Sequence, residues 1–299
     1  TTLPPPTATP DLRQGRWELA AAMPAPARSE MPAVTIGGFI YVPGGFGGET
    51  RLERFDPGSN QWQALADMPA GRHHLMATAY DDKLYVLGGA QSQSWTPTET
   101  VWRYDHETDT WETLTSMPEA RLAGAAVTLD EKIYVAGGTG GSQALLAFSP
   151  DDGTWQSLRA GTQPREHVAA VSFNGEIWLI GGRWSGVGEV NTVEIYDPGS
   201  EQWRPGPSLN TARAGFAAAV VRGQILVAGG EVIINGQETL ASVEILNPTG
   251  DRWEFGPDLP VPIHGVGGAV LEGQVWLPGG SIRAGAIENE GHVQVYFPQ

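Results

Sequence analysis

The chain has 299 residues, of which 40% are hydrophobic and 9% aromatic, and its formal net charge is −16 at pH 7. This composition predicts a globular protein with a packed core, and the acidic surface disfavours nucleic acid and anionic lipids as partners. The absence of cysteine excludes disulfides, thiolate metal ligands and cysteine nucleophiles. We expect no membrane insertion, because no apolar stretch approaches the ~18 residues of a membrane span.

The first 15 residues, TTLPPPTATPDLRQG, are rich in proline and threonine and lack an initiating Met. They also lack the basic and apolar regions of a signal peptide, so we interpret residues 1–15 as a disordered linker left by processing. Residues 16–299 are predicted to form a single domain. We expect an exported protein, periplasmic or extracellular.

Two markers then recur in step along the chain. One is a Gly-Gly pair, as in KLYVLGG at residues 83–89, and the other is a tryptophan. The pairs begin at Gly44, Gly88, Gly137, Gly181, Gly229 and Gly279. The tryptophans are Trp17, Trp62, Trp111, Trp155, Trp203 and Trp253. Both series repeat at intervals of 44 to 50 residues, which predicts a repeat architecture.

Each repeat contains the pattern of four short strands. Strand a is small and apolar (LMATAY, 75–80), strand b ends in Gly-Gly, strand c carries an aromatic residue (VWRYDH, 101–106), and strand d carries the tryptophan. No segment has a sustained helical period. The sequence therefore predicts an all-β protein of antiparallel four-stranded units.

The two ends of the chain complement each other. Trp17 begins a strand d with no earlier strands a to c, and HVQVYFPQ at residues 292–299 is a strand c with no strand d after it. We expect the N-terminal strand d to join the C-terminal strands a to c in a sixth unit, which removes two open sheet edges. Deleting residues 1–22 should then abolish stability, whereas deleting 1–12 should have little effect.

These motifs resemble the Kelch repeat in their double glycine, spaced tyrosine and tryptophan, and period of about 50 residues. The resemblance covers residues 16–299 and implies a six-bladed β-propeller, with each repeat a four-stranded blade around a central channel. Two positions depart from the pattern: Leu246 replaces the strand-c aromatic, and Gly161 replaces the usual Met.

Three repeated features are assigned to the fold. The glycine pairs are followed by β-sequence rather than by the helix that a phosphate loop needs. The tryptophans are expected to pack between blades. Five arginines precede the glycine pairs by 16 residues, and their repetition favours bonds to backbone carbonyls or strand-c acids over a ring that binds carboxylates. They are Arg28, Arg72, Arg121, Arg165 and Arg213.

Residues that break the symmetry are better candidates for function. Those after each glycine pair, such as Arg183 and Glu231, and those after the arginine positions, such as His74, are expected at one channel mouth. The candidates for ligand binding there are Glu30, His73, His74, His167, Arg183, Glu231 and His264. Ordinary polar lining of a water-filled channel is an equally supported alternative.

The loops between strands b and c are long in blades 2, 4, 5 and 6. Trp95 and Trp184 lie in two of these loops, outside the repeated pattern. They are either part of a binding surface or fold back over the rim of the propeller.

Two functions remain open. The first is a module that binds a protein, peptide or glycan on the loop-rich face, as the Kelch resemblance implies. The second is a sugar-acid mutarotase or epimerase similar to N-acetylneuraminate epimerases, with Glu231, His74 and His167 as acid–base candidates and Arg183 for a carboxylate. We assign no enzyme class and no cofactor, and we expect a monomer.

No metal is assigned to the mouth. His73, His74 and His167, with Glu30 or Glu231, offer nitrogen and oxygen ligands, but adjacent histidines in a strand point to opposite faces.

Overall fold

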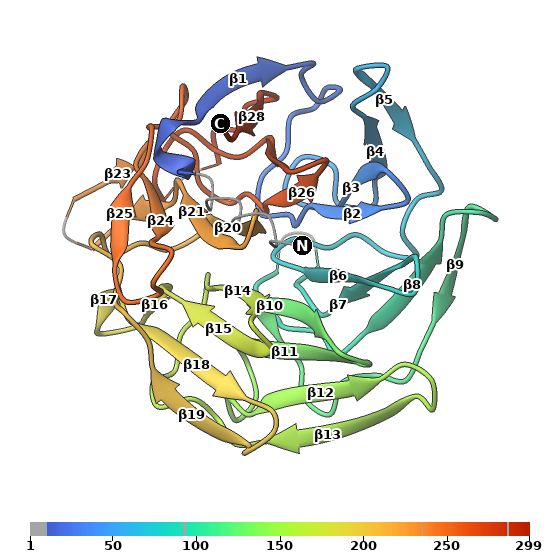
Figure 1. Cartoon of the computed structure of the whole chain (residues 1–299). Coiled ribbons are helices and arrows are strands. Elements are labelled where there is room, and N and C mark those ends of the chain that lie inside the picture. Colours follow the sequence, from blue (N-terminus) through green and yellow to red (C-terminus); the bar gives the residue numbers. More distant parts are fainter. Residues whose placement is uncertain (1–10, 92–93, 235, 286) are drawn as a thin grey trace, which may run out of the picture.

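The strands form six blades around a central axis (Figure 1). The computed structural model describes residues 11–91, 94–234, 236–285 and 287–299. Blade 1 contains β2 (Val34–Ile36), β3 (Phe39–Pro43), β4 (Leu52–Asp56) and β5 (Gln61–Ala64). Blade 2 contains β6 (Met76–Tyr80), β7 (Lys83–Leu87), β8 (Val101–Asp105) and β9 (Thr110–Thr113). Blade 3 contains β10 (Leu122–Leu129), β11 (Lys132–Thr139), β12 (Leu145–Ser149) and β13 (Thr154–Leu158).

Blades 4 and 5 each carry an extra hairpin in the loop between strands b and c. Blade 4 contains β14 (Ala169–Phe173), β15 (Glu176–Ile180), β18 (Val193–Asp197) and β19 (Gln202–Pro205). Blade 5 contains β20 (Ala217–Val221), β21 (Gln224–Ala228), β24 (Val243–Leu246) and β25 (Trp253–Phe255). The extra hairpins, which the sequence pattern did not predict, pair β16 (Arg183–Trp184) with β17 (Gly188–Glu189) and β22 (Glu231–Val232) with β23 (Glu238–Thr239).

The sixth blade is built from both ends of the chain, as predicted. It contains β26 (Ala269–Leu271), β27 (Gln274–Pro278), β28 (Val293–Phe297) and β1 (Arg16–Ala20). β1 runs antiparallel to β28, with Trp17 opposite Tyr296, and Figure 1 shows these first and last strands side by side. The ring is therefore closed by hydrogen bonds between segments about 280 residues apart in the sequence.

The ordered chain starts before the predicted boundary at residue 16. Leu12–Gln14 form a 3₁₀ turn, η1, which Asp11 caps by accepting the N–H of Arg13. Leu12 is fully buried in the core that blades 5 and 6 share, and its carbonyl accepts a hydrogen bond from the Tyr296 hydroxyl. The expectation of disorder is thus wrong for residues 11–15, because an apolar side chain anchors them; for residues 1–10 it lies outside the described residues.

The tryptophan series joins each blade to the preceding one. In all six blades the indole Nε1–H donates to a backbone carbonyl of the preceding blade or its connection, at 2.8–3.1 Å. Trp62, for example, donates to Ala21, and Trp17 donates to Pro257 across the closure. This geometry confirms the structural role predicted for the tryptophans.

The glycine pairs allow two blades to approach closely. Gly88 and Gly89 have φ of +60° and +86°, and a Cβ on Gly88 would lie 2.3 Å from the carbonyl oxygen of Arg121 in the next blade. The N–H of Gly89 donates to the same carbonyl at 2.8 Å. A side chain at residue 88 would therefore separate two main chains that the fold brings together.

The arginine series is buried and acts within the blades. Arg28 donates to the carbonyl of Gly44 at 2.6 Å and pairs with Glu53 at 2.7 Å. Arg213 makes the equivalent bonds to Gly229 and to Glu244, at 2.7 and 2.8 Å. These bonds hold the guanidinium groups of Arg28 and Arg213 inside the fold rather than at the channel mouth, as the repetition indicated.

Candidate functional site

Six residues, one from each connection between blades, form a ring around the axis. Each donates its backbone N–H to the carbonyl of the preceding member, at 2.6–3.0 Å, and the sixth bond closes the circle. All six have a left-handed backbone, with φ between 50° and 65°. In chain order the ring residues are Glu30, His74, Ala123, His167, Gly215 and Gly265.

The residue before each ring member pairs with the residue that follows the glycine pair of the same blade. Glu166 bridges Arg183, and Ala214 bridges Glu231. His73 pairs with Ala90, and His264 pairs with Ser281. The two symmetry-breaking sets therefore lie at one end of the channel, as the sequence predicted.

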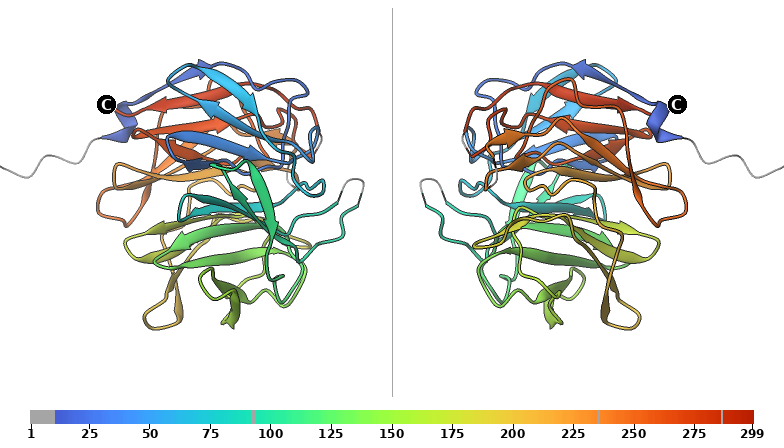
Figure 2. Two further views of the ribbon diagram at one scale, coloured as in Figure 1. Left: turned by 90° about the vertical axis from the view of Figure 1, so that its right-hand side faces the viewer. Right: turned by 90° about the vertical axis from the view of Figure 1, so that its left-hand side faces the viewer.

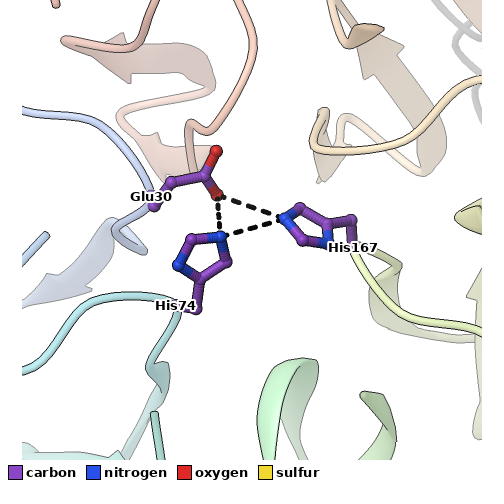
Figure 3. Close-up of side chains that lie close together, drawn as sticks. All are labelled: Glu30, His74 and His167. Carbon is purple, nitrogen blue, oxygen red and sulfur yellow. Dashed lines mark hydrogen bonds and ion pairs between the residues drawn. The ribbon is translucent and has the colours of Figure 1, made fainter. Parts of the chain in front are cut away.

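Three ring side chains meet at the axis (Figure 3). His74 Nε2 lies 3.0 Å from His167 Nε2 and 3.3 Å from Glu30 Oε2, and His167 Nε2 lies 3.8 Å from the same oxygen. Gly265 gives Glu30 its space, since a Cβ there would lie 2.5 Å from Glu30 Oε1. We call Glu30, His74 and His167 the axial triad.

A charged network surrounds the triad on one side. Arg183 lies between Glu166 and Glu231: its Nε donates to Glu166 Oε1 at 2.7 Å and its Nη1 donates to Glu231 Oε1. Glu166 Oε2 accepts from His167 Nδ1. Arg183 is thus held by two carboxylates of this chain, so it is not presented to a ligand carboxylate.

His264 links the triad to Glu231. Its Nε2 donates to the Arg283 carbonyl at 3.0 Å, and its Nδ1 lies 3.5 Å from Glu30 Oε1 and 3.4 Å from Glu231 Oε2. Burial lowers the basicity of the imidazole, but the two carboxylates outweigh burial and raise the pKa of His264. A protonated His264 places one positive charge between them.

Two groups of the triad, His74 and Glu30, have lowered pKa values. Burial lowers the pKa of His74 to about 3, so this imidazole is neutral at physiological pH. Burial opposes ionisation of Glu30, yet the protonated His264 beside it holds the pKa of its carboxyl below the ordinary value. The triad consequently offers a carboxylate and at least one neutral imidazole.

His73 and His74 do not diverge as strand neighbours would. His74 has φ of +52°, outside the strand region, and the Nδ1 atoms of the two rings lie 2.7 Å apart. The objection raised from sequence against a metal at this mouth therefore does not apply, because it assumed an extended backbone.

Trp95 lies over the triad and also faces solvent. Its ring centroid is 4.7 Å from that of His74 and 6.2 Å from that of Phe46, while 62% of the residue is exposed. The contact with His74 agrees with the alternative that this tryptophan folds back over the propeller, and the rest of its side chain is surface; that it belongs to a binding surface stays a prediction. Trp184 lies in β16 and is partly buried.

Three further large apolar side chains are exposed in the loops between strands b and c. They are Val187, Ile234 and Ile287, with exposed fractions of 54%, 56% and 61%. With Trp95 they represent blades 2, 4, 5 and 6, and we call these four residues the apolar crown. Figure 2 shows the loop of blade 2 projecting from one face of the disc.

A cavity of 170 Å³ lies on the axis. The triad, the other ring residues and the residues that lead into the strands a or begin them line it, including Met31, Ala77 and Val168. Neither Arg183 nor Glu231 lines this cavity. The structure thus brings all seven candidates for ligand binding at the mouth into one cluster, but in that cluster Arg183 and Glu231 bind each other.

Glu166 is the residue of this network that the sequence reasoning did not select. The signal was available, because Glu166 occupies the position that pairs with Arg183 across the blade. An acid there, opposite a base, predicts an ion pair.

Fold and site together define a repeat propeller with polar residues on its axis, at the end of the channel that carries the long loops. The chain belongs to the Kelch-repeat family: its residues 9–163 match the KLHDC2/KLHL20/DRC7 Kelch-repeats domain, and residues 164–210 and 212–260 match the Kelch motif.

Curated relatives share short stretches with this chain. Kelch-like protein 25 of Xenopus tropicalis is 37% identical over 84 residues, which are 26% of this chain and 14% of the relative. Kelch-like protein 35 of Mus musculus is 33% identical over 79 residues, 26% of this chain and 13% of the relative. The chain thus spans a small part of the length of these relatives.

A solved structure, "Structure of YjhT", superposes with a TM-score of 0.80 at 17% identity, covering 94% of this chain and 99% of that one. This likeness shows a shared fold. Among the described residues there is no helix long and apolar enough to cross a membrane.

Proposed function

We propose that this Kelch propeller is a binding module whose loop-rich face docks a protein segment. The observation that carries the proposal is the apolar crown: Trp95, Val187, Ile234 and Ile287 come from four different loops and each is more than half exposed. Exposed large apolar residues gathered on one face are typical of protein-binding surfaces.

The charges around the crown indicate the kind of segment that fits. Glu99, Glu238 and Glu288 are exposed in the same loops, against one exposed base, Arg283. The whole chain carries a net charge of −16. A segment that combines apolar with basic side chains would complement this face.

The bonds that Arg183 makes within this chain also favour a macromolecular partner over a small sugar acid. A site for a small sugar acid needs an arginine free to bind its carboxylate, and Arg183 is held between Glu166 and Glu231. The crown offers its apolar surface without displacing any of these bonds.

Peptide selection tests the proposal. A displayed library of protein-derived peptides is selected on the wild type, and the selected peptides are then measured against two double variants. Trp95→Ala with Ile234→Ala alters the crown. Leu19→Ala with Phe255→Ala removes equally exposed apolar residues (54% and 57%) from the outer strands. We expect basic-apolar peptides whose affinity falls at least tenfold in the crown variant only. Peptides that bind both variants as they bind the wild type would contradict the proposal.

A second candidate function is acid–base catalysis on a sugar acid, and one observation favours it. Glu231 and His167, two of the acid–base candidates, lie at one mouth on either side of Arg183. NMR of anomeric exchange with sialic acids tests it: no acceleration over buffer, or an equal rate in Glu231→Gln, removes this candidate. Export and a monomeric state stay predictions.

A further inference from the structure

The axial triad brings three ligand atoms to one point. Glu30 Oε2, His74 Nε2 and His167 Nε2 are separated by 3.0, 3.3 and 3.8 Å, and all three side chains are nearly buried, with exposed fractions of 12%, 2% and 4%. Donors on a tetrahedral Zn²⁺ with bonds of 2.0–2.1 Å are about 3.3–3.4 Å apart. The spacing of the triad is therefore close to that of a metal site (Figure 3).

The hydrogen bonds behind His74 fix which of its nitrogens carries the proton. His73 Nε2 lies 3.2 Å from the carbonyl oxygen of Ser94, which only accepts, so His73 is protonated at Nε2. His73 Nδ1 is then an acceptor, and His74 Nδ1–H donates to it at 2.7 Å. His74 Nε2 is left with a lone pair directed at the triad.

The same argument holds for His167. Its Nδ1–H donates to the carboxylate of Glu166, so Nε2 is the nitrogen that faces the triad. A carboxylate that orients an imidazole in this way is the usual support of a histidine metal ligand. Each imidazole of the triad is thus oriented by a hydrogen bond from its Nδ1 to a residue outside the triad, which is His73 for His74 and Glu166 for His167.

Three donor atoms consequently face one another in a buried place, and either a shared proton or a metal ion must lie between them. Arg183 does not fill this role. Its Nη2 is 3.2 Å from Nε2 and 3.3 Å from Nδ1 of His167, and such equal distances place it over the ring face rather than in line with the lone pair. The network carries three carboxylates, on Glu30, Glu166 and Glu231. Its cations are the guanidinium of Arg183 and the protonated imidazole of His264, so one negative charge is left over.

We propose that Glu30, His74 and His167 bind a divalent transition-metal ion, with Zn²⁺ as the best match to two imidazoles and one carboxylate. This donor set suits zinc and its first-row neighbours rather than Ca²⁺ or Mg²⁺, which take oxygen ligands. Three protein ligands leave a fourth position, and the 170 Å³ cavity that the triad lines gives it room for water. The ring of backbone hydrogen bonds holds the ligands in place before the metal binds.

Metal titration of the 299-residue chain, with any affinity tag removed and the protein first dialysed against a chelator, tests the proposal. We expect one equivalent of Zn²⁺ to bind in calorimetry. Co²⁺ should give the visible absorption bands of a tetrahedral nitrogen–oxygen site, and Zn²⁺ should displace it. Failure of the wild type to bind either ion would overturn the proposal without any variant.

Variants assign the site. His167→Ala should weaken Zn²⁺ binding at least 100-fold, and Glu166→Gln, which removes the supporting carboxylate, about 10–100-fold. His292→Ala is the matched control, because this histidine lies outside the triad and is 40% exposed. Circular dichroism identifies any variant that fails to fold. Zn²⁺ binding that is equal in wild type and in folded His167→Ala would exclude the triad.

Discussion

The hydroxyl of Tyr296 donates a hydrogen bond to the carbonyl of Leu12, 284 residues earlier in the chain. Tyr296 also lies opposite Trp17 in the pairing of β1 with β28, and the two rings are 5.1 Å apart. One residue thus holds both the closing strand and the turn before it, so the closure of the propeller extends to residue 12.

Shortening Leu12 should therefore destabilise the propeller. Leu12→Ala empties a fully buried position between blades 5 and 6, and we expect a loss of about 2–5 kcal/mol in the free energy of unfolding. Urea denaturation measures this loss. Leu19→Ala, at a residue of β1 that is 54% exposed, should stay within about 0.5 kcal/mol. Equal stability of both variants would restore the earlier expectation that residues 1–12 do not matter.

Closure should also weaken at high pH. Burial raises the pKa of Tyr296 to about 12, against ~10 for an exposed tyrosine. The folded state holds this proton more tightly than the unfolded state, so the contribution to stability is complete below pH ~10. It is lost as the pH rises from there through about 12.

The urea midpoint of the wild type should accordingly fall between pH 9.5 and about 11.5. Tyr296→Phe cannot ionise at this position, so its midpoint should fall less steeply. Some slope remains, because burial also raises the pKa of Tyr196 to about 12. A pH slope identical to that of the wild type would show that Tyr296 does not contribute.

Truncating a buried tryptophan of the repeat should destabilise the fold more than truncating the exposed Trp95. Trp253 is 4% exposed and donates to the carbonyl of Pro207, so Trp253→Ala should cost about 3–5 kcal/mol. Trp95 is 62% exposed, and Trp95→Ala should change stability by no more than about 0.5 kcal/mol. Thermal denaturation of both variants gives the comparison; a large loss in Trp95→Ala would mean that its cover of His74 supports the fold.

The first glycine of a pair should tolerate no side chain. At Gly88 a Cβ would meet the Arg121 carbonyl, whereas at Gly175, with a similar φ of +77°, it would meet no atom within 4 Å. Gly175→Ala should therefore lose only the ~1–2 kcal/mol of a left-handed backbone. Gly88→Ala should lose clearly more. Equal losses in the free energy of unfolding would mean that the close approach of the two blades at Gly88 does not restrict the side chain there.

The fold could be predicted from the sequence because each blade repeats the same physical solution. The tryptophan and the second glycine of the pair make the same bonds in all six blades, so any one copy supports the interpretation of the others. The position of Leu12 could not be predicted in this way, since the turn that contains it occurs once and its neighbours are rich in proline and threonine.

The sequence predicts which residues lie together at the channel mouth, but not which bonds they make there. Glu30, His74 and His167 share one position of the repeat, and so the repeat alone places them together. Whether Arg183 faces a ligand or Glu231 depends on how the unequal loops fold over the mouth. The left-handed backbone of His74, which turns it toward His73, likewise has no signal in a strand pattern.

The ring at the axis has a consequence for what this scaffold can present. Its six members are joined through the main chain alone, as in a macrocycle closed by hydrogen bonds, so the identity of their side chains is independent of its integrity. This chain uses that freedom unevenly: blades 1, 2 and 4 supply a carboxylate and two imidazoles, whereas blades 5 and 6 supply glycines. The ring thus carries polar side chains in blades 1, 2 and 4 and no side chain in blades 5 and 6, where the missing Cβ of Gly265 makes room for Glu30. The sixfold frame is therefore asymmetric at its axis.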